Sequence, residues 1–314
     1  MPTLAIAGGT SASLGRAITT ALLQNASQWN AVILSRTTHA PIWLRAIDPD
    51  SARTQIRATA LKGVDTVVSV TSAYDGFGPK GWENVMSTKW TFGGVWEECV
   101  AQKDKIECAK FNHGSFMNYI GHGIYPVPSH VDEASLLEKM KGGGGYMAGE
   151  DDACQGLLRQ GDLKDGSGAF LIGLKNGIAE LPQKDDGSWP RITMTSMKDV
   201  GRFVVASLNL PSGKWEENMT MAGDTLTMGE LLAHAEAITG RKFEASVVKQ
   251  ADLEKKMRET TQDNFMAQMW AEFKLAYIRD MEDEVVLKPV VNQLCPAVKP
   301  MGLREYMETF YRSA

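Results

Sequence analysis

The sequence predicts an α/β fold: a Rossmann-like, doubly wound parallel sheet with a smaller α+β unit attached. Two apolar runs, residues 3–7 and 31–35, have the length and composition of buried strands. Between them, glycines are followed by apolar residues at helical spacing, namely Leu14, Ala17, Ile18, Ala21 and Leu22. About 25 residues from one strand to the next fits a βαβ crossover, so the two strands should be parallel.

The same alternation continues along the first half of the chain. We expect a third strand over residues 43–47, a helix over 51–61 that ends at Gly63, and a fourth strand over 65–71. Three successive crossovers are typical of a doubly wound sheet.

Polar caps mark the helices of the second half. Ser196 and Asp199 are spaced as a capping box ahead of an apolar helical segment. Thr227 and Glu230 repeat this spacing, and the helix that they begin should end at Gly240. We expect a strand and then a methionine-rich helical region to follow, over 242–248 and 251–283. The methionines are interpreted as packing residues.

Composition excludes several classes of partner. The chain has 314 residues, 43% of them hydrophobic, and a net charge of -5, without a basic run that could track phosphates, so we expect no nucleic acid. No apolar stretch approaches the roughly 20 residues that cross a bilayer, and no basic leader precedes the first strand. We therefore expect a cytoplasmic protein without a membrane partner. Neither the four cysteines nor the five histidines show metal-ligand spacing, so no metal site is expected.

The strongest motif lies directly after the first strand. A glycine-rich turn there begins a helix and comprises Gly9, Thr10, Ser11, Ala12, Ser13, Leu14 and Gly15. Glycines let backbone N–H groups approach a pyrophosphate, and the helix N-terminus adds partial positive charge. Ala12 stands where a third glycine is usual, and its methyl group still permits close approach. We therefore predict a dinucleotide site here rather than a purely structural turn.

The end of the second strand selects between two cofactors. A carboxylate there would bind the ribose hydroxyls of NAD and repel a 2′-phosphate. The chain instead has Ser35, Arg36 and Thr37, whose guanidinium and hydroxyl groups suit a phosphate. The predicted cofactor is therefore NADP(H).

Other strand ends add three candidates, because ligands of open sheets bind beyond the carboxyl ends of the strands. Thr71 and Ser72 follow the fourth strand and should lie toward the nicotinamide, whereas Asp48 follows the third strand and should lie toward the adenine. Each residue could equally be an ordinary turn or cap. A different signal is missing: none of the seven tyrosines precedes a lysine by four residues, the acid–base pair of many dehydrogenases on this fold.

Five segments together resemble fungal NmrA-like proteins of the isoflavone reductase group, which are atypical short-chain dehydrogenase/reductases. The segments are GGTSASLGRA, KGVDTVVSV, FNHGSFMNY, SMKDVGRFVVASL and GDTLTMGELLAHAEAITGRKF. The resemblance implies an NADP(H)-binding Rossmann domain, closed by a smaller substrate domain, that reduces aromatic or phenolic compounds. We accordingly assign residues 1–125, with 170–208 contributing a strand and a helix, to the first domain. Residues 126–169 and 209–314 form the second.

The resemblance also implies functional residues. The family commonly places a lysine near the nicotinamide, and Lys89 is the nearest match; the alternative is a surface helix lysine. Burial or a cationic cofactor beside it would suit Lys89 to acid–base work. The family loop beside the nicotinamide corresponds to a segment that should border the substrate and contains His113, Ser115, Phe116 and Tyr119. A packing role fits each of these four equally well.

Two functions stay open at this point. The first is an NADP(H)-dependent reductase, or a cofactor-bound isomerase, of an aromatic secondary metabolite. The second is a non-catalytic NADP(H)-sensing regulator that acts through protein partners. Only 34 residues, 72–105, separate the fourth strand from a strand expected to begin at Ile106, so we expect one crossover of the family to be missing. We prefer the enzyme, as a monomer or homodimer, because aromatic and methionine residues around 82–119 and 257–277 could line a hydrophobic pocket.

Overall fold

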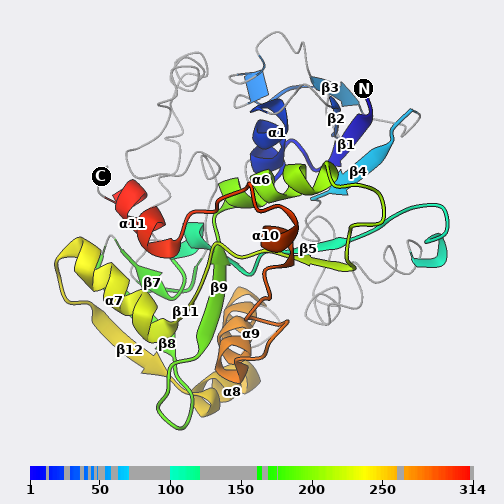
Figure 1. The fold of residues 1–314 in the computed structure, drawn as a ribbon. Coiled ribbons are helices and arrows are strands. Elements are labelled where there is room, and N and C mark those ends of the chain that lie inside the picture. The colour runs from blue at the N-terminus through cyan, green and yellow to red at the C-terminus, as the bar shows by residue number, and fades with distance from the viewer. Residues whose placement is uncertain are drawn as a thin grey trace.

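The computed structural model describes most of the second half of the chain and the central elements of the first (Figure 1). The described residues are 1–11, 14–24, 29–35, 39–41, 44–45, 48, 54–57, 63–70, 100–120, 161–164, 169–174, 176–259 and 265–311.

The N-terminal part is a four-stranded parallel sheet. Its strands lie in the order β3-β2-β1-β4, with bounds β1 (Thr3–Ala7), β2 (Asn30–Leu34), β3 (Thr54–Arg57) and β4 (Thr66–Ser69). Ala5 of the central strand aligns with Val32 on one side and with Val67 on the other. Because β2 and β3 lie on one side of β1 and β4 lies on the other, the strand order reverses at β1, as in doubly wound folds. The predicted fold class is confirmed.

The third strand was predicted in the wrong place. Residues 54–57, expected in a helix, form β3, whereas Leu44 and Arg45 of the expected strand are helical. The Leu44 and Arg45 N–H groups both donate to the Pro41 carbonyl, and proline favours the first turn of a helix. Leu44 is buried against Leu23 and Ile33, and a short apolar run buried in this way cannot be told from a strand by its pattern.

A helix from much later in the chain packs on the first helix. α1 (Leu14–Gln24) lies against α6 (Met197–Leu208), as Figure 1 shows. A Cβ added at Gly201 would overlap the Ala17 carbonyl oxygen, so the two helices meet backbone to backbone. The apolar residues of α1, α6 and β1 form one core, which includes Leu4, Ile18 and Phe203.

A short segment links this core to the rest of the molecule. β5 (Lys110–Asn112) pairs in parallel with β10 (Asn218–Thr220), and β6 (Ser115–Phe116) pairs in parallel with β9 (Arg191–Thr195). The strand expected from Ile106 therefore begins at Lys110. It is short because its partner strand β10 has only three residues.

We call the elements around the other large core the second unit, and it contains two further sheets. β9 pairs with antiparallel β11 (Asp224–Thr227), while β8 (Ile178–Pro182) lies between antiparallel β7 (Ile172–Gly173) and parallel β12 (Glu244–Val248). The remaining described helices are η1 (Met117–Ile120), α7 (Met228–Thr239), α8 (Gln250–Glu259), α9 (Phe265–Arg279), α10 (Val290–Leu294) and α11 (Leu303–Tyr311). The predicted strand over 242–248 and the helical region over 251–283 are thus confirmed in outline.

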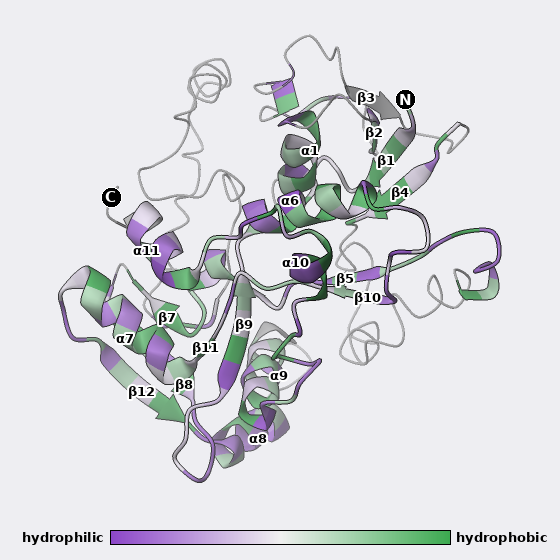
Figure 2. Ribbon diagram, in the orientation of Figure 1, coloured by the Kyte–Doolittle hydropathy of each residue, from purple (hydrophilic) through white to green (hydrophobic). Residues whose placement is uncertain are grey.

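The predicted capping box at Thr227 and Glu230 is complete, whereas at Ser196 only the cap by the hydroxyl forms and the Asp199 carboxylate accepts from that hydroxyl. The Ser196 hydroxyl accepts from the Asp199 N–H at 3.1 Å, and the Thr227 hydroxyl accepts from the Glu230 N–H at 3.2 Å. α7 ends at Gly240, whose φ of 69° lies in the left-handed region. In Figure 2, hydrophobic and hydrophilic residues alternate along α7, as expected for a helix with one buried face. No helix of the described residues is long and apolar enough to cross a membrane.

Candidate dinucleotide and substrate site

The turn after β1 fits the pyrophosphate of a dinucleotide. Gly8 has a φ of 78°, which favours glycine, and its carbonyl accepts from the Ser11 N–H at 3.0 Å. A Cβ at Gly15 would overlap the same Gly8 carbonyl, so only glycine lets α1 begin this close to the turn. The positive end of α1 consequently lies against the turn, where it can stabilise a bound phosphate.

Several predicted cofactor contacts lie in this turn. The Ser11 hydroxyl accepts from the Gly15 N–H at 3.0 Å and so fixes the start of α1. A Cβ at Gly9 would approach the Ile6 and Ile33 side chains to 3.1 Å, tighter than ordinary contact. Thr10 lies in the turn between Gly9 and Ser11, and Leu14 is the first residue of α1.

The other predicted contacts divide into two groups. Ser35 directly follows β2, as expected, whereas Asp48, which is buried, precedes β3 instead of following the third strand. The adenine-side argument for Asp48 therefore loses its premise, because it depended on the misplaced third strand. The remaining predicted residues lie outside the described residues: Ala12, Arg36, Thr37, Thr71, Ser72 and Lys89.

Two of the predicted substrate residues lie beside the first helix. The His113 ring stacks on Phe116, with ring centroids 4.1 Å apart and planes 19° apart. Phe116 packs in turn against Ala17 of α1 and Met197 of α6. The Cβ clash that an alanine at Gly114 would make with the Thr193 backbone shows how closely this segment lies against β9. The structure thus brings the predicted substrate segment next to the helix that begins at the dinucleotide turn.

His113 provides an uncharged polar atom at this place. Burial lowers the pKa of His113 to about 4, an effect only partly offset by backbone hydrogen bonding at Gly114 and at His113 itself. The imidazole is therefore neutral at physiological pH. Its Nδ1 atom is buried and has no hydrogen-bond partner among the described residues.

Ser115 points in the opposite direction from Phe116, because neighbouring side chains alternate along a strand. Its hydroxyl hydrogen-bonds to the phenol of Tyr277, near the end of α9. Tyr277 is only 5% exposed, and burial raises its pKa to about 12, so the phenol is protonated. The sequence offered no signal for Tyr277, because the two residues are 162 positions apart.

Tyr119, in η1, packs against the core that also contains Tyr277. Its ring packs edge-on against Trp270, with centroids 5.9 Å apart. The Trp270 ring also contacts the rings of Phe170 and Phe273, so Tyr119 packs against the core of the second unit. The Tyr119 ring therefore packs in this core, and its role beside the substrate stays a prediction.

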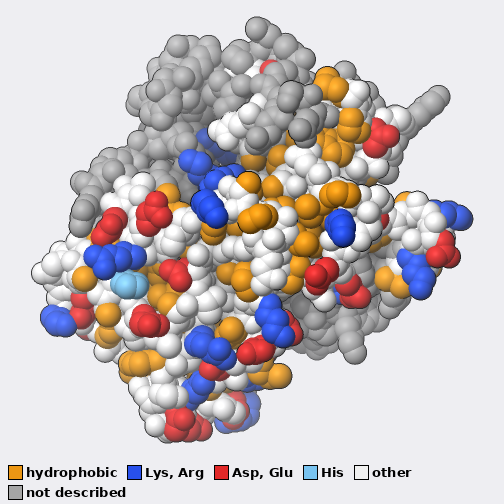
Figure 3. Space-filling model, viewed as in Figure 1, with side chains coloured by type: hydrophobic (Ala, Val, Ile, Leu, Met, Phe, Trp, Pro, Cys, Tyr) orange, Lys and Arg blue, Asp and Glu red, His pale blue; other side chains and the backbone are white. Residues whose placement is uncertain are grey.

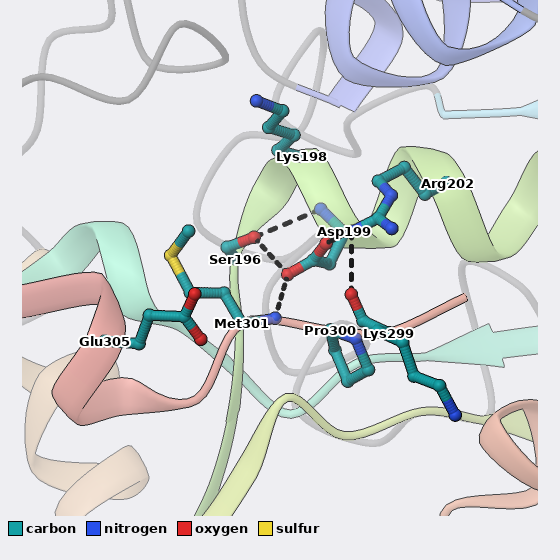
Figure 4. A pocket seen from close by; sticks show the side chains of 8 residues that line it. All are labelled: Ser196, Lys198, Asp199, Arg202, Lys299, Pro300, Met301 and Glu305. Atoms are coloured by element: carbon teal, nitrogen blue, oxygen red, sulfur yellow. Dashed lines mark hydrogen bonds and ion pairs between the residues drawn. The ribbon is translucent and has the colours of Figure 1, made fainter. Parts of the chain in front are cut away.

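A small open pocket, about 230 Å³ in volume, lies where α6 begins (Figure 4). Its centre is the Asp199 carboxylate, which accepts from Arg202 at 2.6 Å and from the Met301 N–H at 2.9 Å. Lys and Arg side chains also gather on the surface over the start of α6 (Figure 3). Because these bonds join α6 to the segment before α11, the pocket marks a structural junction. It contains none of the residues predicted for the site.

The strand order, the glycine turn and the helix packed against it define a Rossmann-like dinucleotide-binding fold. No family model matches the chain. A curated relative, oxidoreductase BOA1 of Botryotinia fuckeliana, is 46% identical over 52 residues, and this match spans only 17% of each chain.

Solved structures match along nearly the whole chain. A nucleoside-diphosphate-sugar epimerase of Staphylococcus aureus is similar over 98% of this chain and 100% of its own, with a TM-score of 0.60 and 15% identity. An isoflavone reductase is similar over 98% of this chain and 99% of its own, with a TM-score of 0.59 and 15% identity. AtPrR2, solved with NADP+ and (+)-pinoresinol, is similar over 98% of each chain, with a TM-score of 0.56 and 17% identity. The chain therefore has the fold of the isoflavone reductase-like proteins, as the sequence resemblance implied.

Proposed function

We propose that the protein is an NADPH-dependent reductase of a small, uncharged aromatic molecule. The observation that carries the proposal is the contact between the predicted cofactor and substrate elements: Phe116, stacked with His113, packs on Ala17, less than one helical turn beyond Gly15. A ligand that borders His113 would thus lie near the end of a dinucleotide held at the glycine turn. The oxidoreductase relative and the neighbour solved with NADP+ and (+)-pinoresinol support this function.

Separate residues of the chain would bind the cofactor, border the substrate and move the proton. The turn over Gly8 and Gly15 would hold the pyrophosphate, and Arg36 would bind the 2′-phosphate. NADPH supplies a hydride when bound. The neutral His113 and Phe116 rings offer a flat, apolar wall, which favours an uncharged aromatic substrate over an anionic one. Lys89 remains the proposed acid–base lysine.

The first test measures cofactor preference. NADPH, NADP+ and NADH are titrated by calorimetry into the wild type, Arg36→Ala and a charge-matched control, Arg304→Ala, which removes an exposed arginine from α11. Wild type and the control should bind NADPH at least tenfold more tightly than NADH, and Arg36→Ala should lose that preference, because about 1.4 kcal/mol corresponds to tenfold.

The second test is a screen for NADPH oxidation against quinones and enones. Turnover of one of them supports the reductase. Tight NADPH binding without turnover of any compound would favour the sensing function, and failure to bind any dinucleotide would contradict both functions.

A further inference from the structure

Arg16 is a buried arginine at the start of α1. It directly follows Gly15, and its backbone N–H donates to the Ser11 carbonyl of the dinucleotide turn at 3.1 Å. The residue is only 8% exposed. Arginine is rarely buried to this extent, because the charged guanidinium loses its hydration. The tight approach of α1 to the turn requires the glycine at position 15, but it does not require an arginine beside it.

The position of Arg16 adds a second electrostatic cost. The N-terminus of α1 is the positive end of the helix dipole, where a positively charged side chain is disfavoured. α1 has no acidic residue in its first turn, so the helix itself supplies no opposite charge there. A bound anion would offset both the burial and the helix-end cost. The phosphates of a dinucleotide are expected at the turn that immediately precedes Arg16.

The face of α1 that carries Arg16 lies toward β2. Residues seven positions apart share a face of a helix, and Leu23, seven residues after Arg16, packs with Ile33 of β2. Long helical side chains also lean back toward the helix N-terminus, so the side chain of Arg16 extends toward the carboxyl end of β2. In folds of this class, the adenosine ribose of a dinucleotide lies at the end of this strand.

We propose that Arg16 binds the 2′-phosphate of NADP(H) and thereby helps the protein to select this cofactor over NAD(H). This inference rests on the proposed function, which takes NADPH as the cofactor. A guanidinium can donate two parallel hydrogen bonds to a phosphate, which a lysine cannot do with the same geometry. A dinucleotide without the 2′-phosphate would not provide this anion. Arg16 is thus a residue for cofactor specificity, contributed by the helix that also holds the pyrophosphate.

The variants separate a contact with the 2′-phosphate from a general role in folding. Arg16→Gln removes the charge, and Arg16→Lys keeps the charge without the planar fork. Arg202→Gln is the matched control, because Arg202 also lies near the start of a helix, α6, where it donates to Asp199 at 2.6 Å. Each protein is titrated by calorimetry with NADPH, NADH, adenosine 2′,5′-bisphosphate and adenosine 5′-monophosphate. The last two ligands differ only in the 2′-phosphate and contain no nicotinamide.

Arg16→Gln should reduce the preference for NADPH over NADH, and for the bisphosphate over the monophosphate, by about tenfold, the usual effect of losing one hydrogen bond to a charged group. The affinity for NADH should stay at the wild-type value. Arg16→Lys should lose part of each preference. Arg202→Gln should lower the melting temperature and change neither preference. Equal weakening of NADPH and NADH in Arg16→Gln, or an unchanged preference, would overturn the proposal.

Two further outcomes are decisive. If Arg16→Gln does not fold, Arg16→Lys takes its place: a reduced preference for NADPH supports the proposal, and a preference equal to that of the wild type overturns it. A wild type that binds no dinucleotide would overturn the proposed function itself and this inference with it. If the wild type prefers NADPH, Arg36→Ala loses that preference and Arg16→Gln keeps it in full, the proposed function stands and only this inference fails.

Discussion

The N-terminal sheet and the second unit hold their elements together in different ways. In the N-terminal part, backbone meets backbone at Gly15 and Gly201, where no side chain fits. In the second unit, the fully buried Lys274 of α9 bonds to Asp162 at 2.6 Å and also to Glu180. A close approach requires only a glycine, whereas a buried lysine requires two partners, here 112 and 94 positions away. Both regions therefore join distant segments, since Gly201 meets Ala17, but the first needs only a missing side chain and the second needs matched charges.

The strongest test of this contrast is Lys274→Met. The substitution leaves the Asp162 and Glu180 carboxylates without their buried cation, and we expect a loss of about 3–5 kcal/mol in the free energy of unfolding. Urea denaturation measures it. The control Lys255→Met removes an exposed lysine 3.9 Å from Glu259 and should cost less than about 1 kcal/mol. Similar losses in the two variants would show that the buried cluster does not stabilise the second unit.

The corresponding test in the first region is Gly201→Val. Its side chain would overlap the Ala17 backbone and push α6 away from α1, with an expected loss of about 2–3 kcal/mol. Lys198→Val places the same side chain at an exposed position of the same helix and serves as the control in denaturation experiments. An equally stable Gly201→Val protein would refute the close packing of the two helices.

The smallest effect at neutral pH is expected at the boundary between the two regions, where the effect grows only in acid. The pKa of His113 falls from 6.5 to about 4 on folding, so between these values the unfolded chain binds more protons than the folded one. Stability should therefore decrease as the pH falls from 6.5 toward 4, and this contribution is absent above 6.5. His113→Gln should make this pH dependence shallower, by up to about 3 kcal/mol across the whole window. Melting curves at several pH values measure it, and an unchanged slope would mean that the imidazole is not buried.

The sequence predicted those parts of the fold whose signals are local. β1, α1 and β2 follow from apolar periodicity around a glycine turn, and both helix N-caps, Ser196 and Thr227, follow from polar residues three positions apart. The third strand was missed because a short apolar run does not distinguish a helical turn from a strand. The start of β5 was predicted four residues too early. Its length is set by pairing with β10, whose residues lie 108 positions later in the chain.

The candidate site shows the same division between local and long-range information. Sequence alone determined the glycine turn and its suitability for a dinucleotide, because the conformation of Gly8 and the space at Gly15 depend on neighbours within the turn. Only the tertiary structure decided that His113 and Phe116 lie beside α1 and that Ser115 meets Tyr277. Those contacts arise from strand pairing and helix packing between segments far apart in the chain, and no local pattern carries that information.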